Sequence, residues 1–281
     1  MMTDAPSQPP ITTDDSFLSG KVHLRQLRDG YRVGTDTVIL AASINIGAAD
    51  EHQTGKQVDK QTGKKAGSRK RLLDMGAGVG GISLAVCQRR ADVHITAIER
   101  DQASYDLLCH NISINNRIEV IHPHLGDVLA LPQVLRGSFD HVFANPPFHY
   151  SSDIPSRSRR RREACYANNV ALSDWVTSAL WAVKPKGRVS FIVRADRTDQ
   201  VMRSLSDAGA GEVLLYPIWS YRGSPAIRMI ITARAGVKGP MAILPGLVLH
   251  HPSGALTLEA RRVMKGEGLL FRHPATTHLL A

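Results

Sequence analysis

The sequence predicts an α/β fold with a mostly parallel sheet and helices on both faces. Short apolar segments alternate with stretches of helical periodicity between residues 72 and 208, which is the pattern of strand-helix repeats. In addition, four successive apolar segments end in a turn, an acid or an amide, at Gly76, Glu99, Asp127 and Asn145. Because ligands of open α/β sheets bind at the carboxyl ends of parallel strands, these four ends predict one binding site.

The first predicted strand, residues 72–75, runs into a glycine-rich turn that is followed by a helical pattern. Glycine permits positive φ and lets a ligand approach the backbone, and the amides that begin a helix can receive a carboxylate or a phosphate. The spacing Gly76-x-Gly78-x-x-Gly81 satisfies the dinucleotide fingerprint, with Glu99 at the place of the ribose-binding acid. The motif alone fits both NAD and S-adenosylmethionine.

Two acids favour S-adenosylmethionine. Asp74 stands at the end of the first strand, where a carboxylate would repel a pyrophosphate but not a cationic sulfonium amino acid. Asp127 follows a third predicted strand, with Ile118, Val120 and Ile121 as its apolar residues. A carboxylate at this point could accept a hydrogen bond from an adenine amine.

The fourth strand ends in Asn145-Pro146-Pro147-Phe148. Two successive prolines remove two backbone donors and fix φ, and Pro146 also favours an extended Asn145. The loop therefore offers carbonyl and amide oxygens together with an aromatic ring. Such a loop can accept the hydrogens of an exocyclic amine while the ring stacks on a planar group, which suits a flipped nucleobase.

The order of these motifs resembles the class I S-adenosylmethionine-dependent methyltransferases of the N6-adenine type. Residues 29–36, residues 161–166 and the helix of Trp175 further resemble the bacterial tRNA1(Val) adenine-37 N6-methyltransferases, and the similarity covers roughly residues 20–235. The resemblance implies a Rossmann-like fold with seven strands, one of them antiparallel, S-adenosylmethionine as cofactor and an RNA substrate.

The resemblance also implies roles for the motif residues. Glu99 would bind the ribose hydroxyls and Asp127 the adenine amine of the cofactor. The methionyl end would lie against Thr35, Asp74 and the loop of Gly76, Gly78 and Gly80. Asn145, Pro146, Pro147 and Phe148 would hold the reacting amine, and Asn145 would also border the cofactor.

Three alternatives differ in substrate or in activity. Phe148 replaces the tyrosine usual in the tRNA enzymes, and Phe148-His149 resembles the rRNA guanine-N2 methyltransferases. Protein glutamine-N5 methyltransferases use the same loop, but Phe148 and the positive charge of the chain argue against them. The third alternative, an inactive RNA-binding relative, is disfavoured because all four strand-end motifs are intact.

The second half of the chain predicts a helix over residues 199–208 and strands near residues 212–217 and 227–234. Because no crossover helix fits between the last two strands, we expect an antiparallel pair, which brings the total to seven. Beyond residue 236 the chain is broken by Pro and Gly, with a short strand at 247–250 and a short helix at 257–265. We expect residues 236–281 to form a peripheral C-terminal extension of a methyltransferase domain at 20–235.

The net charge of +10 and the pI of about 9.8 predict a polyanionic partner. Arg159, Arg160, Arg161 and Arg162 follow the proline loop, where we expect them to contact RNA phosphates. A second basic stretch, residues 50–70, is of low complexity and predicts a linker within the domain.

Composition excludes several other classes. Residues 1–16 lack the basic and apolar regions of a signal peptide and predict a disordered tail, assigned to residues 1–19, and no stretch is apolar enough to span a membrane. Three scattered cysteines and unpaired histidines support neither disulfides nor a metal site. A hydrolase is discarded because no Gly-x-Ser-x-Gly motif occurs. We therefore expect a cytoplasmic enzyme without membrane or metal partners.

Overall fold

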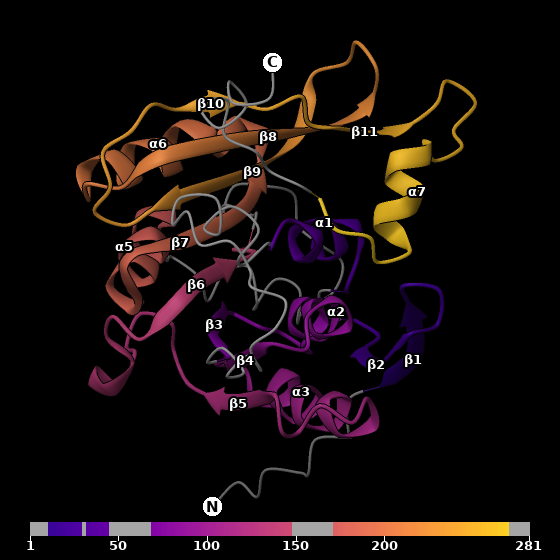
Figure 1. The fold of residues 1–281 in the computed structure, drawn as a ribbon. Coiled ribbons are helices and arrows are strands. Elements are labelled where there is room, and N and C mark those ends of the chain that lie inside the picture. Colours follow the sequence, from indigo (N-terminus) through magenta and orange to yellow (C-terminus); the bar gives the residue numbers. More distant parts are fainter. Residues whose placement is uncertain (1–10, 30–31, 45–68, 148–170, 270–281) are drawn as a thin grey trace, which may run out of the picture.

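The computed structural model describes residues 11–29, 32–44, 69–147 and 171–269. Within them, one nine-stranded sheet has the order β10-β8-β9-β7-β6-β3-β4-β5, with β11 also paired to β8 (Figure 1). Its seven longer strands are β3 (Lys70–Met75), β4 (Val93–Glu99), β5 (Ile121–Leu125), β6 (Phe139–Ala144), β7 (Val183–Arg194), β8 (Gly211–Tyr221) and β9 (Ala226–Arg234).

Strand direction follows the prediction. The pairs β3–β4, β3–β6, β4–β5 and β6–β7 are parallel. Strand β9 lies between β7 and β8 and is antiparallel to both. The predicted seven strands with the last one inserted are therefore confirmed, and β10 (Ala242–Ile243) and β11 (Leu247–His250) extend the sheet beyond β8.

Helices cover both faces of the sheet, as predicted (Figure 1). One face carries α1 (Thr35–Ser43), α2 (Gly81–Arg89), α3 (Gln102–Ile114) and α7 (Leu258–Met264), and the other carries α5 (Leu172–Ala182) and α6 (Thr198–Asp207). Short 3-10 turns lie at η1 (Gln133–Leu135) and η2 (Ala195–Arg197). Buried neighbours such as Leu72 and Leu73 belong to opposite apolar clusters, because successive side chains of a strand point to opposite faces.

The third strand begins later than predicted. Ile118 and Val120 lie in the turn that follows α3, and Ile118 is 61% exposed. Asn116 has a φ of 54°, and the Arg117 amide donates to the Ile112 carbonyl. The helix end thus occupies the residues that apolar content alone assigned to β5. The prediction that Gly126-Asp127 follows this strand is correct.

The N-terminal segment is ordered where a tail was predicted. β1 (Thr12–Phe17) pairs antiparallel with β2 (Val22–Leu27) in a separate two-stranded sheet. The facing residues Asp14 and Arg25 form an ion pair at 2.8 Å, one of the cross-strand contacts that stabilise such a hairpin. The prediction of a disordered tail over residues 1–19 is therefore wrong from residue 11 onward, and residues 1–10 lie outside the described residues.

The C-terminal extension is part of the main core up to residue 269. The predicted strand and helix are present as β11 and α7, and Leu247 and Val263 are buried against the sheet and helix α1. The expectation of a peripheral extension is therefore wrong for these residues. The predicted linker at 50–70 lies outside the described residues up to 68, whereas Lys70 already begins β3. In the part of the chain that the structure describes, no helix has the length and apolarity to cross a membrane.

Candidate active site

The ends of four neighbouring strands bring the predicted site residues to one edge of the sheet. Met75, the last residue of β3, faces Ala144 of β6 on one side and Ile98 of β4 on the other. Glu99 faces Leu125 at the end of β5. The glycine loop, Glu99, Asp127 and Asn145 therefore follow adjacent, parallel strands, which is where open α/β sheets bind ligands.

The glycine loop connects β3 to α2 through left-handed backbone. Gly76, Gly78 and Gly80 have φ values of 67°, 56° and 92°, conformations that non-glycine residues adopt at a cost. The Ala77 amide donates to the Ile98 carbonyl at 2.8 Å, which fixes the loop to β4. The loop thus turns its backbone toward the strand ends and leads into α2, whose first residue is Gly81.

Glu99 organises the backbone around it. Its Oε2 atom accepts from the Gly78 amide at 2.8 Å, and its Oε1 atom accepts from the amides of Arg100 and Asp101, each at 2.8 Å. The half-buried carboxylate therefore connects the glycine loop to the start of α3. Each carboxylate oxygen can accept more than one hydrogen bond, so ribose hydroxyls remain possible further donors.

Asp74 lies in β3, one residue before its end. Its side chain is fully buried, and Oδ2 accepts a hydrogen bond from the Ser83 hydroxyl at 2.6 Å. Burial raises the pKa of Asp74 to about 7, and the nearby Glu99 charge acts in the same direction, while hydrogen bonds from Ser83 oppose the rise. The structure therefore places this acid in contact with the first turn of α2, and its direct contact with a ligand stays a prediction.

Asp127 follows the end of β5, next to the end of β4 that carries Glu99. The Gly126 amide donates to the Glu99 carbonyl at 2.9 Å, which joins the two strand ends. The Asp127 Oδ1 atom accepts from the Leu129 amide at 2.9 Å. This contact holds a half-buried carboxylate at the position predicted to receive the adenine amine.

Asn145 follows the last residue of β6 directly. Asn145 is half-buried, Pro146 is buried and Pro147 is exposed. Because β6 pairs with β3, the Asn145 backbone lies next to the start of the glycine loop. Phe148 and the arginines Arg159, Arg160, Arg161 and Arg162 lie outside the described residues, so their predicted roles stay predictions.

Thr35 begins α1 and is exposed, beside the start of α2. A Cβ atom at Gly81 would lie 2.5 Å from Val33 and 3.1 Å from Thr37, which shows how closely residues 33–37 pack on α2. Asp36 forms an ion pair with Arg228 of β9 at 2.8 Å. The residues on both sides of Thr35 are thus fixed: Val33 packs against α2, and Asp36 is paired with β9 of the sheet.

Sequence reasoning missed three supporting residues. Ser83 donates to Asp74, as described above. Trp175 of α5 packs on the loop so tightly that a Cβ atom at Gly76 would lie 2.7 Å from its ring. Asn111 of α3 donates to the Val79 carbonyl at 2.9 Å. Asn111 had a detectable signal, because it lies in line with Leu108 and Ile112 on the apolar face of its helix.

No group of three or more His, Cys, Asp or Glu side chains that could hold a metal ion occurs among the described residues. The side chain of the buried His141 is hydrogen-bonded to the Ser190 hydroxyl at 2.8 Å, and that hydroxyl is hydrogen-bonded to the Thr232 hydroxyl at 2.8 Å. Burial lowers the pKa of His141 to about 3. This chain of side chains crosses three strands within the core and is distant in sequence from the motifs at the strand ends.

The strand order, the inserted antiparallel strand and the glycine loop at the carboxyl edge define a class I methyltransferase fold of the Rossmann type. Residues 50–161 match the methyltransferase small domain. The chain is 26% identical over 191 residues to the tRNA1(Val) (adenine(37)-N6)-methyltransferase of Actinobacillus succinogenes, covering 68% of this chain and 72% of that enzyme. The protein is an S-adenosylmethionine-dependent methyltransferase.

Solved structures agree on the fold. A crystal structure of a predicted O-methyltransferase from Agrobacterium tumefaciens has a TM-score of 0.63 and 21% sequence identity, and the match covers 84% of this chain and 99% of that chain. M. jannaschii TYW2 in complex with AdoMet has a TM-score of 0.52 and 12% identity, with 81% and 86% covered. At these identities the similarity concerns the fold alone.

Proposed function

We propose that the protein transfers the methyl group of S-adenosylmethionine to the exocyclic amine of a nucleobase in RNA, with N6 of adenine in a tRNA anticodon loop as the preferred acceptor. The observation that carries the proposal is the position of Asn145 and Pro146, which follow β6 directly beside the glycine loop. The tRNA1(Val) (adenine(37)-N6)-methyltransferases among the relatives support the choice of adenine and of tRNA.

The cofactor would lie across the strand ends. Glu99 would accept the ribose hydroxyls, Asp127 the adenine amine, and the loop of residues 76–80 with Thr35 and Asp74 would border the methionyl end. The hydrogen bond from the Gly126 amide to the Glu99 carbonyl supports this arrangement, because it brings the end of β4 next to Asp127. The methyl group would then lie near the end of β6, within reach of Asn145.

The acceptor amine would be held by oxygen atoms alone. The Asn145 side-chain oxygen and the Pro146 carbonyl would accept its two hydrogens, draw the nitrogen toward a tetrahedral geometry and align its lone pair with the methyl group. Pro147 has no amide hydrogen to compete for these acceptors. Positioning and electrostatics would supply most of the rate enhancement, since the nitrogen becomes acidic once it is methylated and needs no strong base.

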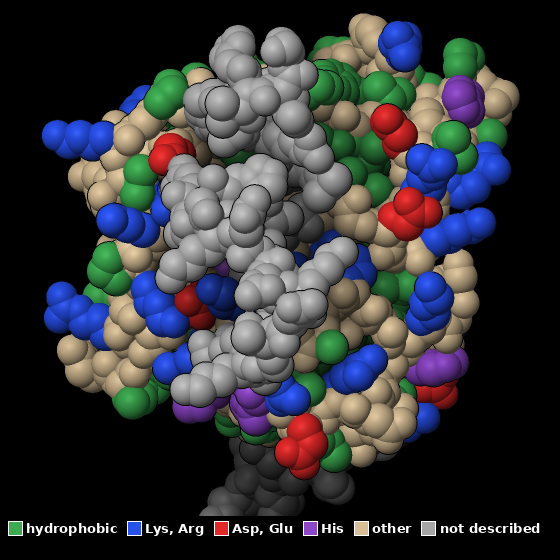
Figure 2. All heavy atoms as spheres, in the orientation of Figure 1, with side chains coloured by type: hydrophobic (Ala, Val, Ile, Leu, Met, Phe, Trp, Pro, Cys, Tyr) green, Lys and Arg blue, Asp and Glu red, His purple; other side chains and the backbone are tan. Residues whose placement is uncertain are grey.

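The base would leave its stack to reach this site. Unstacking costs a few kcal/mol and costs least in a single-stranded loop, whereas stacking on an aromatic ring such as Phe148 returns about 1–3 kcal/mol. The net charge of +10 supports a polyanionic substrate, and Lys and Arg side chains are spread across the face shown in Figure 2. Arg159, Arg160, Arg161 and Arg162 would contact the RNA backbone. A tRNA substrate would place the enzyme in the cytoplasm.

The guanine-N2 reaction in rRNA is the second candidate, because Phe148-His149 resembles the enzymes that perform it. We favour adenine because two separate segments, residues 29–36 and 161–166, resemble the tRNA enzymes. In a site arranged for adenine, the O6 atom of guanine would face the Pro146 carbonyl, and two acceptors in contact repel each other. A protein glutamine amide is the third candidate, and Phe148 in place of the tyrosine usual in those enzymes and the net charge of +10 argue against it.

Methyl transfer from labelled S-adenosylmethionine to total tRNA, rRNA and protein fractions tests the proposal. We expect label in tRNA as N6-methyladenosine beside the anticodon. N2-methylguanosine in small-subunit rRNA would replace the adenine assignment, and label in protein alone would refute the RNA substrate.

Asn145→Ala tests the mechanism. We expect it to abolish transfer while the affinity for RNA stays nearly unchanged, because the lost contact is with the reacting amine. Asn115→Ala, at the C-cap of α3 and far from the strand ends, is the matched control and should retain transfer. Turnover by Asn145→Ala at the wild-type rate would contradict the mechanism.

A further inference from the structure

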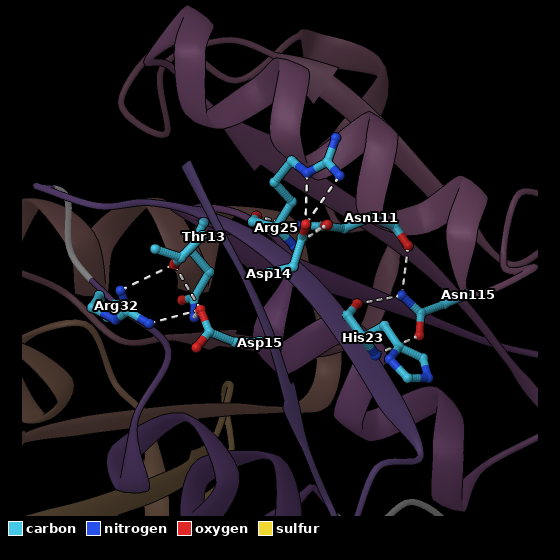
Figure 3. Close-up of polar contacts among 9 residues, drawn as sticks. Thr13, Asp14, Asp15, His23, Arg25, Arg32, Asn111 and Asn115 are labelled. Atoms are coloured by element: carbon cyan, nitrogen blue, oxygen red, sulfur yellow. Dashed lines mark hydrogen bonds and ion pairs between the residues drawn. The ribbon is translucent and has the colours of Figure 1, made fainter. Parts of the chain in front are cut away.

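The N-terminal hairpin is held on helix α3 by two asparagine side chains one helical turn apart. Asn111 Oδ1 accepts from the Arg25 amide at 2.7 Å, and Asn111 Nδ2 donates to the Arg25 carbonyl at 3.0 Å. Asn115 makes the same exchange with His23, at 3.0 and 2.7 Å (Figure 3). Each carboxamide thereby takes the place of a neighbouring strand for β2, whose other edge pairs with β1.

Asn111 and Asn115 differ in burial and in the further bond that each Nδ2 atom donates: Asn115 donates to the Asn111 carbonyl at 2.7 Å within its own helix end, whereas Asn111 reaches another segment. Its Nδ2 atom also donates to the Val79 carbonyl at 2.9 Å, inside the glycine loop. The Asn111 side chain is fully buried, so water has no access to take the place of this bond. One carboxamide therefore joins three segments: strand β2, helix α3 and the loop between β3 and α2.

The hairpin contacts the same region from a second side. Arg32 donates to Asp15 at 2.7 Å and to Thr13 at 3.1 Å (Figure 3). The Val33 amide donates to the buried Gln26 side chain at 2.7 Å. Val33 in turn packs on Gly81, the first residue of α2. Docking of the hairpin thus fixes both the segment before α1 and the glycine loop.

We propose that Asn111 is a positioning residue for the cofactor, which holds the Val79 carbonyl and so keeps the glycine loop in the conformation that binds S-adenosylmethionine. The inference rests on the proposed cofactor site. Without Asn111, the Val79 carbonyl oxygen loses the buried donor that it accepts from. The loop then gains alternative conformations. A smaller fraction of binding-competent molecules raises the apparent dissociation constant in proportion. Asn111 touches neither substrate nor reacting atoms, so the chemical step itself should be little affected.

Asn111→Ala and Asn115→Ala form a matched pair of variants. Both remove the two-bond exchange with β2, but only Asn111→Ala removes the bond to the loop. We expect Asn111→Ala to weaken S-adenosylhomocysteine binding about tenfold, since a lost buried hydrogen bond is worth about that factor. The Michaelis constant for S-adenosylmethionine should rise equally, and kcat at saturating cofactor should stay within about twofold. Asn115→Ala should lower thermal stability while its cofactor affinity stays at the wild-type value.

The outcome is decided by calorimetric titration of the folded variants with S-adenosylhomocysteine. Equal affinities of Asn111→Ala and Asn115→Ala would overturn the proposal, and so would a loss of kcat without a change in affinity. Asn111→Ser, which retains a hydroxyl donor, should have an intermediate affinity and carries the same test if Asn111→Ala does not fold. Glu99→Ala separates a failure of the proposed cofactor site from a failure of the role given to Asn111. If Glu99→Ala binds S-adenosylhomocysteine as tightly as the wild type, the proposed site is contradicted. If Glu99→Ala binds it more weakly while Asn111→Ala keeps the wild-type affinity, only the inference about Asn111 is contradicted.

Discussion

Asp74 makes the stability of the protein depend on pH in an unusual direction for a carboxylic acid. Burial raises its pKa to about 7 in the folded protein, against 3.8 for an exposed carboxyl. The replacement Asp74→Asn keeps the shape of the side chain and an oxygen that can accept from Ser83. It removes only the ionisation.

The sign follows from proton binding. Between pH 4 and pH 7 folded Asp74 retains a proton that the unfolded chain has released, so the unfolding free energy of the wild type falls as pH rises. This contribution is fully present below pH 3.8 and is lost as pH rises through 7. The difference between the two pKa values corresponds to about 4 kcal/mol as an upper limit. The acids with lowered pKa values, such as Asp14 and Asp92, act in the opposite direction at lower pH.

Urea denaturation of the wild type and Asp74→Asn between pH 4 and pH 8 isolates the effect, because all other groups are common to both proteins. We expect the wild type to lose about 2–4 kcal/mol relative to Asp74→Asn across this range. The difference should become constant above pH 8. Two parallel stability curves would show that Asp74 ionises freely in the folded protein and would refute the reasoning.

Two further predictions concern the cofactor loop. Glu99→Ala should weaken S-adenosylhomocysteine binding by about 1–3 kcal/mol in calorimetry, and the wild type should not bind NAD; NAD binding or an unchanged affinity would contradict the site. Gly76→Ala should lower the unfolding free energy by about 1–3 kcal/mol more than Gly209→Ala, because its Cβ would lie 2.7 Å from the Trp175 ring, whereas Gly209 has a similar φ of 71° and open space around it. Equal losses in thermal unfolding would rule out the contact with Trp175.

The sequence predicted the fold and the arrangement of the strand ends because both depend on local patterns. An apolar segment that ends in a glycine turn, an acid or Asn-Pro marks a strand and its carboxyl end, and parallel strands bring those ends together. The antiparallel β9 followed from the short connection after β8. These features needed no knowledge of contacts between distant residues.

The supporting contacts could not be predicted because they join distant segments. Strand β1 is almost wholly polar, and it forms a strand only because β2 offers a partner and Arg32 offers an ion pair to Asp15. The burial of Asp74 depends on Ser83 and on the helices packed above it. Asn111 was visible as a polar residue on an apolar helix face, but its two partner residues, Val79 and Arg25, lie 32 and 86 residues away.

The strands contributed by the C-terminal extension cover one edge of the main sheet. Strand β10 pairs with β8 at Leu214 and Leu215, and β11 pairs with it from Ile218 to Tyr221. A chain cut after residue 235 would present β8 as a bare edge of 11 residues, and unpaired edges of that length invite strand exchange and aggregation. At the opposite edge, β5 is short and contains Pro123, which discourages such pairing. The residues beyond 235 therefore cover the edge of β8 that a chain without them would expose.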